Sequence, residues 1–238
     1  MTEPLHCRAL LFDLDGALVD TAPDLCRAMN HVLTRRHGIT LPLDHVTHLV
    51  GHGARALLAR GFWGEGAEPP NNDPDFETAV AEFLEYYRDH LVDNSRPFPD
   101  VTTTLELLAA TGFAMAVVTN KPEMLARSLL DQLDLSRHFS LIVGGDTRPT
   151  RKPDPQPLLF ALEHLHIPPD QGVMIGDSET DLQAARNAGM PVILLSYGYN
   201  RGKDVRDLLP DRVADRFNQL PGLLHYFYPS RTKSTCHH

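Results

Sequence analysis

The stretch LLFDLDG at residues 10–16 decides the fold and locates the chemistry. Leu10-Leu11-Phe12 is an apolar run with an aromatic residue, which is typical of a buried parallel strand. Asp13 and Asp15 follow two residues apart, so both carboxylates leave the strand on the same side. Gly16 then lets the chain turn sharply away from a crowded site. We therefore predict a strand tip with two acids that can bind a hard cation, one of them also able to act as a nucleophile.

Composition narrows the classes of protein. The chain has 238 residues, 42% of them hydrophobic, so it can bury a substantial core in one large domain or two smaller ones. Its net charge of −9 argues against a broad surface for nucleic acid or anionic lipid, and no apolar run reaches the ~20 residues of a membrane span. Residues 1–7 lack the apolar core of a signal peptide, and the three cysteines are not spaced as a disulfide framework. We expect a cytoplasmic protein, monomeric or homodimeric, that binds neither nucleic acid nor membrane.

Two kinds of pattern divide the chain. Between residues 22 and 91, apolar residues recur at helical spacing and no convincing strand is found. From Pro97 onward, short apolar runs alternate with helical segments, which is typical of a parallel, doubly wound sheet with right-handed crossovers. The strands expected after the first are residues 113–118, 141–143, 173–175, 192–195 and a short last one at 213–214. We predict an α/β core of residues 1–17 and 97–238, with a small α-helical cap domain of residues 18–96 inserted after the first strand.

Three further motifs carry related chemistry. One expected strand ends at Thr119-Asn120, and another ends in the run Gly176–Asp181, while Lys152 opens the helical segment before that second strand. The carboxyl ends of parallel strands gather at one edge of a sheet, so these groups should meet Asp13 there. A carboxylate nucleophile, a hydroxyl, a cation and further acids are what phosphoryl transfer needs. An isolated Asp-x-Asp-Gly also occurs in solvated turns, and the four motifs together weigh against that alternative.

The four motifs resemble those of the haloacid dehalogenase superfamily of aspartyl-phosphate phosphatases, and the resemblance spans nearly the whole chain. The helical insertion is similar to the superfamily's small cap. Shorter stretches look like bacterial phosphoglycolate phosphatases: DTAP at 20–23, GHGA at 51–54, VTNKP at 118–122, GGD at 144–146 and SYGYN at 196–200. The resemblance implies a phosphomonoesterase for a small phosphorylated metabolite, with 2-phosphoglycolate as the preferred substrate.

The resemblance also implies a role for each catalytic residue. Asp13 attacks phosphorus to form an aspartyl-phosphate, and Asp15 protonates the leaving oxygen and then accepts a proton from the hydrolytic water. Thr119 holds a phosphoryl oxygen beside the amide of Asn120. Lys152 offsets the charge of Asp13 and of the phosphoryl group.

Mg²⁺ is the implied cofactor. Its implied ligands are the carboxylates of Asp13 and Asp177 and the backbone carbonyl of Asp15, with Asp181 as a weaker ligand or as a support to the ligands. A cation is needed physically because an anionic carboxylate must approach an anionic phosphate.

One position departs from the family pattern. The family usually has Thr after the Asp-Gly pair, and this chain has Ala17. A hydroxyl there would hydrogen-bond within the loop that orients Asp15, and its loss costs about 1 kcal/mol. We expect a less ordered loop and intact chemistry.

The cap should choose the leaving group and exclude water. Gly53, in the stretch Gly51-His52-Gly53-Ala54-Arg55, allows a close approach to substrate, and Arg55 could bind a substrate carboxylate. The alternative for Arg55 is an ordinary solvent-facing side chain on a helix.

Other functions stay open at this point. The substrate could be another small sugar phosphate or amino-sugar phosphate, and a phosphosugar mutase would use the same motifs. A non-catalytic binding protein could keep the fold, although the intact Asp13, Asp15, Lys152 and Asp177 speak against it.

Overall fold

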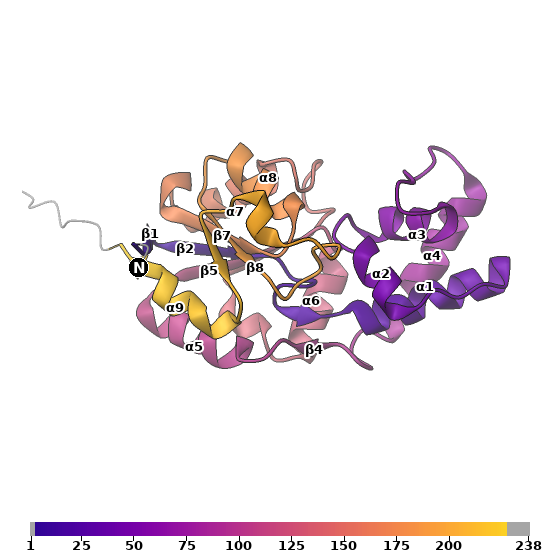
Figure 1. Ribbon diagram of the computed structural model, residues 1–238, viewed down its shortest axis with the longest axis horizontal. Coiled ribbons are helices and arrows are strands. Elements are labelled where there is room, and N and C mark those ends of the chain that lie inside the picture. Colours follow the sequence, from indigo (N-terminus) through magenta and orange to yellow (C-terminus); the bar gives the residue numbers. More distant parts are fainter. Residues whose placement is uncertain (1–2, 228–238) are drawn as a thin grey trace, which may run out of the picture.

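The computed structural model describes residues 3–227 and has two parts (Figure 1). A sheet with helices on both faces forms one part, and the helices from α1 (Ala22–His37) to α4 (Pro74–Asp89) form the other, beyond one end of the sheet. Of the three cysteines in the sequence, Cys236 lies outside the described residues. No helix within the described range is long and apolar enough to cross a bilayer.

The main sheet has six parallel strands in the order β6-β5-β2-β7-β8-β9. Their bounds are Leu141–Val143, Ala114–Val118, Ala9–Phe12, Gly172–Gly176, Val192–Leu195 and Arg212–Ala214. Strand β2 is central, and Phe12 is in register with Val117 of β5 and Ile175 of β7. The segments that follow these three strands therefore begin at the same edge of the sheet.

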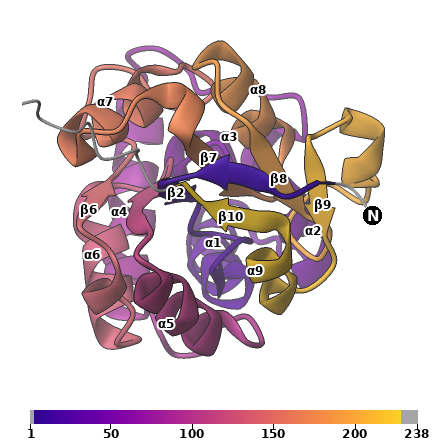
Figure 2. The ribbon, with the colours of Figure 1, turned by 90° about the vertical axis from the view of Figure 1, so that its left-hand side faces the viewer.

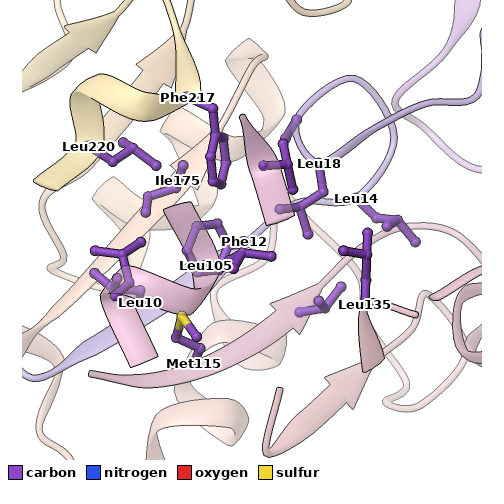
Figure 3. Close-up of a cluster of buried hydrophobic side chains, with 14 of the residues drawn as sticks. Leu10, Phe12, Leu14, Leu18, Leu105, Met115, Leu135, Ile175, Phe217 and Leu220 are labelled. Atoms are coloured by element: carbon purple, nitrogen blue, oxygen red, sulfur yellow. The ribbon is translucent and has the colours of Figure 1, made fainter. Parts of the chain in front are cut away.

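Alternate residues of β2 serve opposite faces of the sheet. Leu10 and Phe12 pack with α5 (Val101–Thr111), α6 (Glu123–Gln132) and the C-terminal Phe217 and Leu220 (Figure 3). Ala9 and Leu11 pack with α7 (Gln156–Leu165) and α8 (Glu179–Asn187) on the other face (Figure 2). A strand covered on both faces must be apolar throughout, which is why the sequence of β2 reads as a continuous hydrophobic run.

The helical part is the segment between two short antiparallel strands, β3 (Val19–Asp20) and β4 (Arg96–Pro97). Its helices are α1 (Ala22–His37), α2 (Leu43–Leu49), α3 (Ala54–Trp63) and α4 (Pro74–Asp89). They bury a separate apolar cluster that includes Met29, Leu58, Phe83 and Tyr87. The structure confirms the predicted fold class of a doubly wound parallel sheet with a helical insertion.

Two pairs of short strands were not predicted. One is the β3–β4 pair, and the other joins β1 (Leu5–Cys7) in parallel to β10 (Leu224–Tyr226), which follows the short helix α9 (Leu220–Leu223). Strands of two or three residues carry too little alternation to be recognised in a sequence.

Candidate active site

The carboxylate of Asp13 has one oxygen engaged and one free. Its Oδ1 accepts a hydrogen bond from the Leu14 amide (2.8 Å) and contacts Nζ of Lys152 (2.9 Å), whereas Oδ2 has no hydrogen bond to any described residue. Burial and the neighbouring Asp181 raise the pKa of Asp13 to about 6, although Lys152 opposes the shift. The free oxygen is therefore the one available for attack or for a metal.

Asp15 has the same asymmetry. Its Oδ1 accepts hydrogen bonds from the hydroxyl of Thr21 (2.7 Å) and from Nζ of Lys121 (2.9 Å), and Oδ2 is without a protein partner in the described chain. Gly16 adopts φ +87°, and a Cβ there would lie 2.3 Å from a carboxylate oxygen of Asp177. Glycine thus allows the loop after β2 to touch the neighbouring strand tip.

Lys152 and Asp181 form a buried pair. Nζ of Lys152 lies 2.7 Å from Asp181 and 2.9 Å from Asp13, and burial of the lysine is outweighed by these two carboxylates, which raise its pKa to about 12. The other oxygen of Asp181 accepts hydrogen bonds from the amide and hydroxyl of Ser178 and from the Asp177 amide. Both oxygens of Asp181 are thus engaged by protein donors, which favours positioning of Lys152 over direct metal ligation.

The acids at the tips of β2 and β7 fit a hard divalent cation. Asp13, Asp177 and Asp181 can place one carboxylate oxygen each within 4.8 Å of one another, and all three are buried. Burial, with the charges of Asp181 and Asp13, raises the pKa of Asp177 well above its ordinary value. Carboxylate oxygens crowded in this way are the ligands that Mg²⁺ prefers, and a cation would relieve their repulsion. The Asp15 side chain is not in this cluster, so any contribution from Asp15 would come from its backbone.

Thr119 and Asn120 follow β5, beside Asp13. The Thr119 hydroxyl accepts from the Lys121 amide (3.2 Å) and keeps its own proton free to donate. The Asn120 side chain donates to the carbonyls of Gly51 in the cap (3.1 Å) and of Lys152 (3.0 Å). Asn120 thus ties the cap to the core as well as lining the site.

A small cavity of about 40 Å³ lies between the cap and these strand tips. Asp13 and Asp15 line it from the core, together with Thr119, Asn120 and Lys121. Its cap side is mostly apolar and is lined by Leu25, Val50, Leu57, Phe83 and Leu84, with Tyr87 also present. The two aspartates therefore face a mostly apolar surface of the cap.

The two cap residues predicted to bind substrate lie in different places. Gly53 lines the cavity with φ +84°, and a Cβ there would approach the Asn120 carbonyl to 3.1 Å. Arg55 is directed elsewhere, since its guanidinium pairs with Glu77 and lies 5.3 Å from the ring centroid of Phe76. Arg55 is not among the residues lining the cavity. The structure therefore favours the alternative of a partly exposed, helix-surface arginine.

Sequence reasoning missed Lys121 and Tyr87 as site residues. Nζ of Lys121 joins Asp15 Oδ1 to the hydroxyl of Tyr87 (2.8 Å), and both side chains are buried. Lys121 directly follows Thr119-Asn120 in a strand-tip motif, which is a signal that could have identified it. Tyr87 belongs to the apolar face of α4, and its spacing in the sequence does not predict the contact with Lys121.

The chain is similar to known proteins over most of its length. Residues 10–195 match the haloacid dehalogenase-like hydrolase family. The chain belongs to that family. The match confirms the resemblance carried by the four motifs and the expectation of an enzyme of the phosphatase class.

Individual relatives cover most of the chain. A phosphoglycolate phosphatase from Psychrobacter arcticus is 40% identical over 93% of this chain and 97% of its own length. Another, from Thiobacillus denitrificans, is 42% identical over 89% of this chain and 92% of its own. The crystal structure of a predicted phosphoglycolate phosphatase from Haemophilus somnus is 33% identical, with a TM-score of 0.85 over 91% of this chain and 97% of the other.

Proposed function

We propose that the protein hydrolyses 2-phosphoglycolate through an aspartyl-phosphate on Asp13, with Mg²⁺ as cofactor. The observation that carries the proposal is the pair of half-engaged carboxylates, Asp13 and Asp15, which line one small cavity under the cap. Each is held through Oδ1 and keeps Oδ2 for chemistry.

In the first step, the carboxylate of Asp13 attacks phosphorus and the bond from phosphorus to the glycolate oxygen breaks. Asp15 donates a proton to that leaving oxygen. Lys152 balances negative charge on Asp13, and the Thr119 hydroxyl donates to a phosphoryl oxygen. Mg²⁺ would be held by Asp13 and Asp177 with the Asp15 carbonyl, and when bound it lowers the repulsion between carboxylate and phosphate.

In the second step, water attacks phosphorus and the bond to Asp13 breaks. The carboxylate of Asp15 accepts the proton from the attacking water, so that Asp13 is restored and phosphate leaves. Thr21 and Lys121 hold Asp15 in place for both proton transfers.

The substrate assignment draws on the relatives and on the cavity. The similar proteins from Psychrobacter arcticus and Thiobacillus denitrificans are phosphoglycolate phosphatases. The narrow cavity favours a small leaving group, and the ammonium of Lys121 is a cation on its wall. Since Arg55 is turned away, we assign no role in carboxylate recognition to it.

The test is phosphate release from 2-phosphoglycolate beside a panel of sugar and amino-sugar phosphates. We expect Mg²⁺-dependent release that EDTA abolishes and that is fastest with 2-phosphoglycolate. Asp13→Asn should lower the rate by at least about a thousandfold, as removal of a nucleophile does. Asp134→Asn, on an exposed turn, is the matched control and should keep the wild-type rate.

Other outcomes of this assay select other functions. A faster rate with a sugar phosphate would make that compound the preferred substrate. Transfer of the phosphoryl group to a sugar would indicate a mutase. No release from any member of the panel would contradict hydrolysis altogether.

A further inference from the structure

Two arginines contact one histidine where the cap meets the core. Nη1 of Arg60, on α3, lies 3.2 Å from Nδ1 of His52, and Nη2 of Arg201 lies 3.4 Å from both ring nitrogens. Arg151 adds a third positive charge near the same ring, within a chain whose net charge is −9. His52 and Arg60 belong to the cap, whereas Arg151 and Arg201 belong to the core.

Arg60 is the unusual member of this cluster. The residue is only 7% exposed, its Nε has no hydrogen-bond partner, and no described carboxylate lies within 4.0 Å of its guanidinium. Glu65 and Glu68 act on it only at longer range. A buried guanidinium without a counter-charge is strongly destabilising, so the position calls for an anion.

His52 contributes no positive charge of its own near neutral pH. Partial burial, followed by the charges of Arg60 and Arg201, lowers its pKa to about 4. The neutral ring accepts a hydrogen bond in the absence of an anion and can turn to donate one when an anion is present.

A cavity of about 160 Å³ opens beside this cluster. His52, Arg201 and Lys203 line it, whereas Arg60 is not among the lining residues and reaches the site through its contact with His52. The cavity shares only Val50 and Gly51 with the catalytic cavity. Of its two acidic lining residues, Asp204 pairs with Arg206, whereas Glu179 keeps its charge and accepts a hydrogen bond from the neutral Gln183. The cavity has room for a small oxyanion, since one water needs only about 10–15 Å³ of such space.

We propose that His52 and Arg201, with Arg60 in contact with the histidine ring, form a binding site for a small oxyanion, separate from the catalytic cavity. The anion joins the cap to the core, because its ligands come from both parts of the chain. Its binding therefore stabilises the closed arrangement of the two parts.

The experiment is a calorimetric titration of the full-length, metal-free protein with sulfate at constant ionic strength. Because the catalytic site also holds the cations Lys121 and Lys152, the heat is assigned to the arginine cluster by comparing the variants below. We expect saturable binding and a rise in the melting temperature. Arg60→Met should weaken binding by about tenfold or more, as expected for loss of a charged hydrogen-bond donor. Arg27→Met, which removes a cap arginine paired with Asp93, should bind sulfate as the wild type does.

Arg201→Met keeps the test valid if the Arg60 variant fails to fold, because Arg201 lies on a half-buried loop. It should also weaken sulfate binding by about tenfold. Absence of saturable binding in the wild type, or equal affinity in the Arg201 and Arg27 variants, would overturn the proposal. Neither result would bear on phosphate release at Asp13, since the titration involves no turnover.

Discussion

At the scale of single residues, each of the two aspartates has one carboxylate oxygen bound by protein donors and the other free to react. Thr21 and Lys121 hold one oxygen of Asp15, and Lys152 holds one oxygen of Asp13. The family's usual hydroxyl after the Asp-Gly pair is therefore not required to orient Asp15. Ala17 itself is fully buried, and its carbonyl accepts a hydrogen bond from the Tyr197 hydroxyl (2.8 Å).

A hydroxyl introduced at position 17 should have little effect on the kinetics. We expect Ala17→Thr to alter kcat and the metal affinity by less than about twofold, because two other donors already fix Asp15. Steady-state kinetics across a Mg²⁺ titration measure both quantities. A severalfold gain in kcat would show that the loop is poorly ordered without the hydroxyl.

Tyr87 should act on the reaction through Lys121. We expect Tyr87→Phe to lower kcat by about tenfold with a smaller effect on KM, because the lysine loses one of the two partners that fix it beside Asp15. The matched control is Tyr86→Phe, since Tyr86 is stacked between His31 and His90 and away from the site. Equal kinetics in the two variants would remove Tyr87 from the account.

At the scale of elements, the first turn of α1 fastens the cap to its second connection with the core. The buried carboxylate of Asp24 accepts hydrogen bonds from the Ser95 amide (2.7 Å) and hydroxyl (2.8 Å) and from the Asn94 amide (2.9 Å). The Tyr199 hydroxyl accepts from the first amides of the same helix, at Thr21 and Ala22. Strand β4 begins directly after Ser95, so these bonds fix the chain where it returns to the core.

Asp24→Asn should therefore lower the free energy of unfolding by about 3 kcal/mol, because an amide cannot accept so many donors with both of its polar atoms. Burial alone would raise the pKa of Asp24, but the hydrogen bonds from Asn94 and Ser95 lower it overall. The stabilisation is thus present above the ordinary pKa of about 4 and is lost as the pH falls through the lower folded-state value. Urea titrations at pH 7 and pH 3 measure this, with exposed Asp44→Asn as control. A difference between wild type and variant that did not shrink at pH 3 would contradict the assignment.

Elements of sufficient length were predictable from the sequence, and short ones were not. Strand β2 is buried on both faces, so its apolar run and its place before Asp13 could be recognised directly. The pair β3–β4 has two residues in each strand, and only the folded chain brings them together. Lys152 was expected to open a helix, but α7 begins at Gln156 and Lys152 lies in the loop before it.

At the scale of the whole molecule, part of the candidate site was predictable from the sequence and part was not. Asp13, Thr119 and Lys152 follow from motifs at one sheet edge, which topology brings together. Contacts between the cap and the core depend on how α3 and α4 are oriented, and sequence spacing does not report that orientation. The sequence therefore left Arg55 open between a substrate ligand and a surface residue, and the structure pairs it with Glu77. Tyr87 was missed although it contacts Lys121.

The most direct test of the central claim is acid quenching of the wild-type enzyme during turnover of 2-phosphoglycolate with Mg²⁺, followed by mass spectrometry of its peptides. We expect one added phosphoryl group on the peptide that contains Asp13, with none on the same peptide of Asp13→Asn. Turnover with no phosphorylated peptide at any quench time, or a phosphoryl group on another residue, would contradict it.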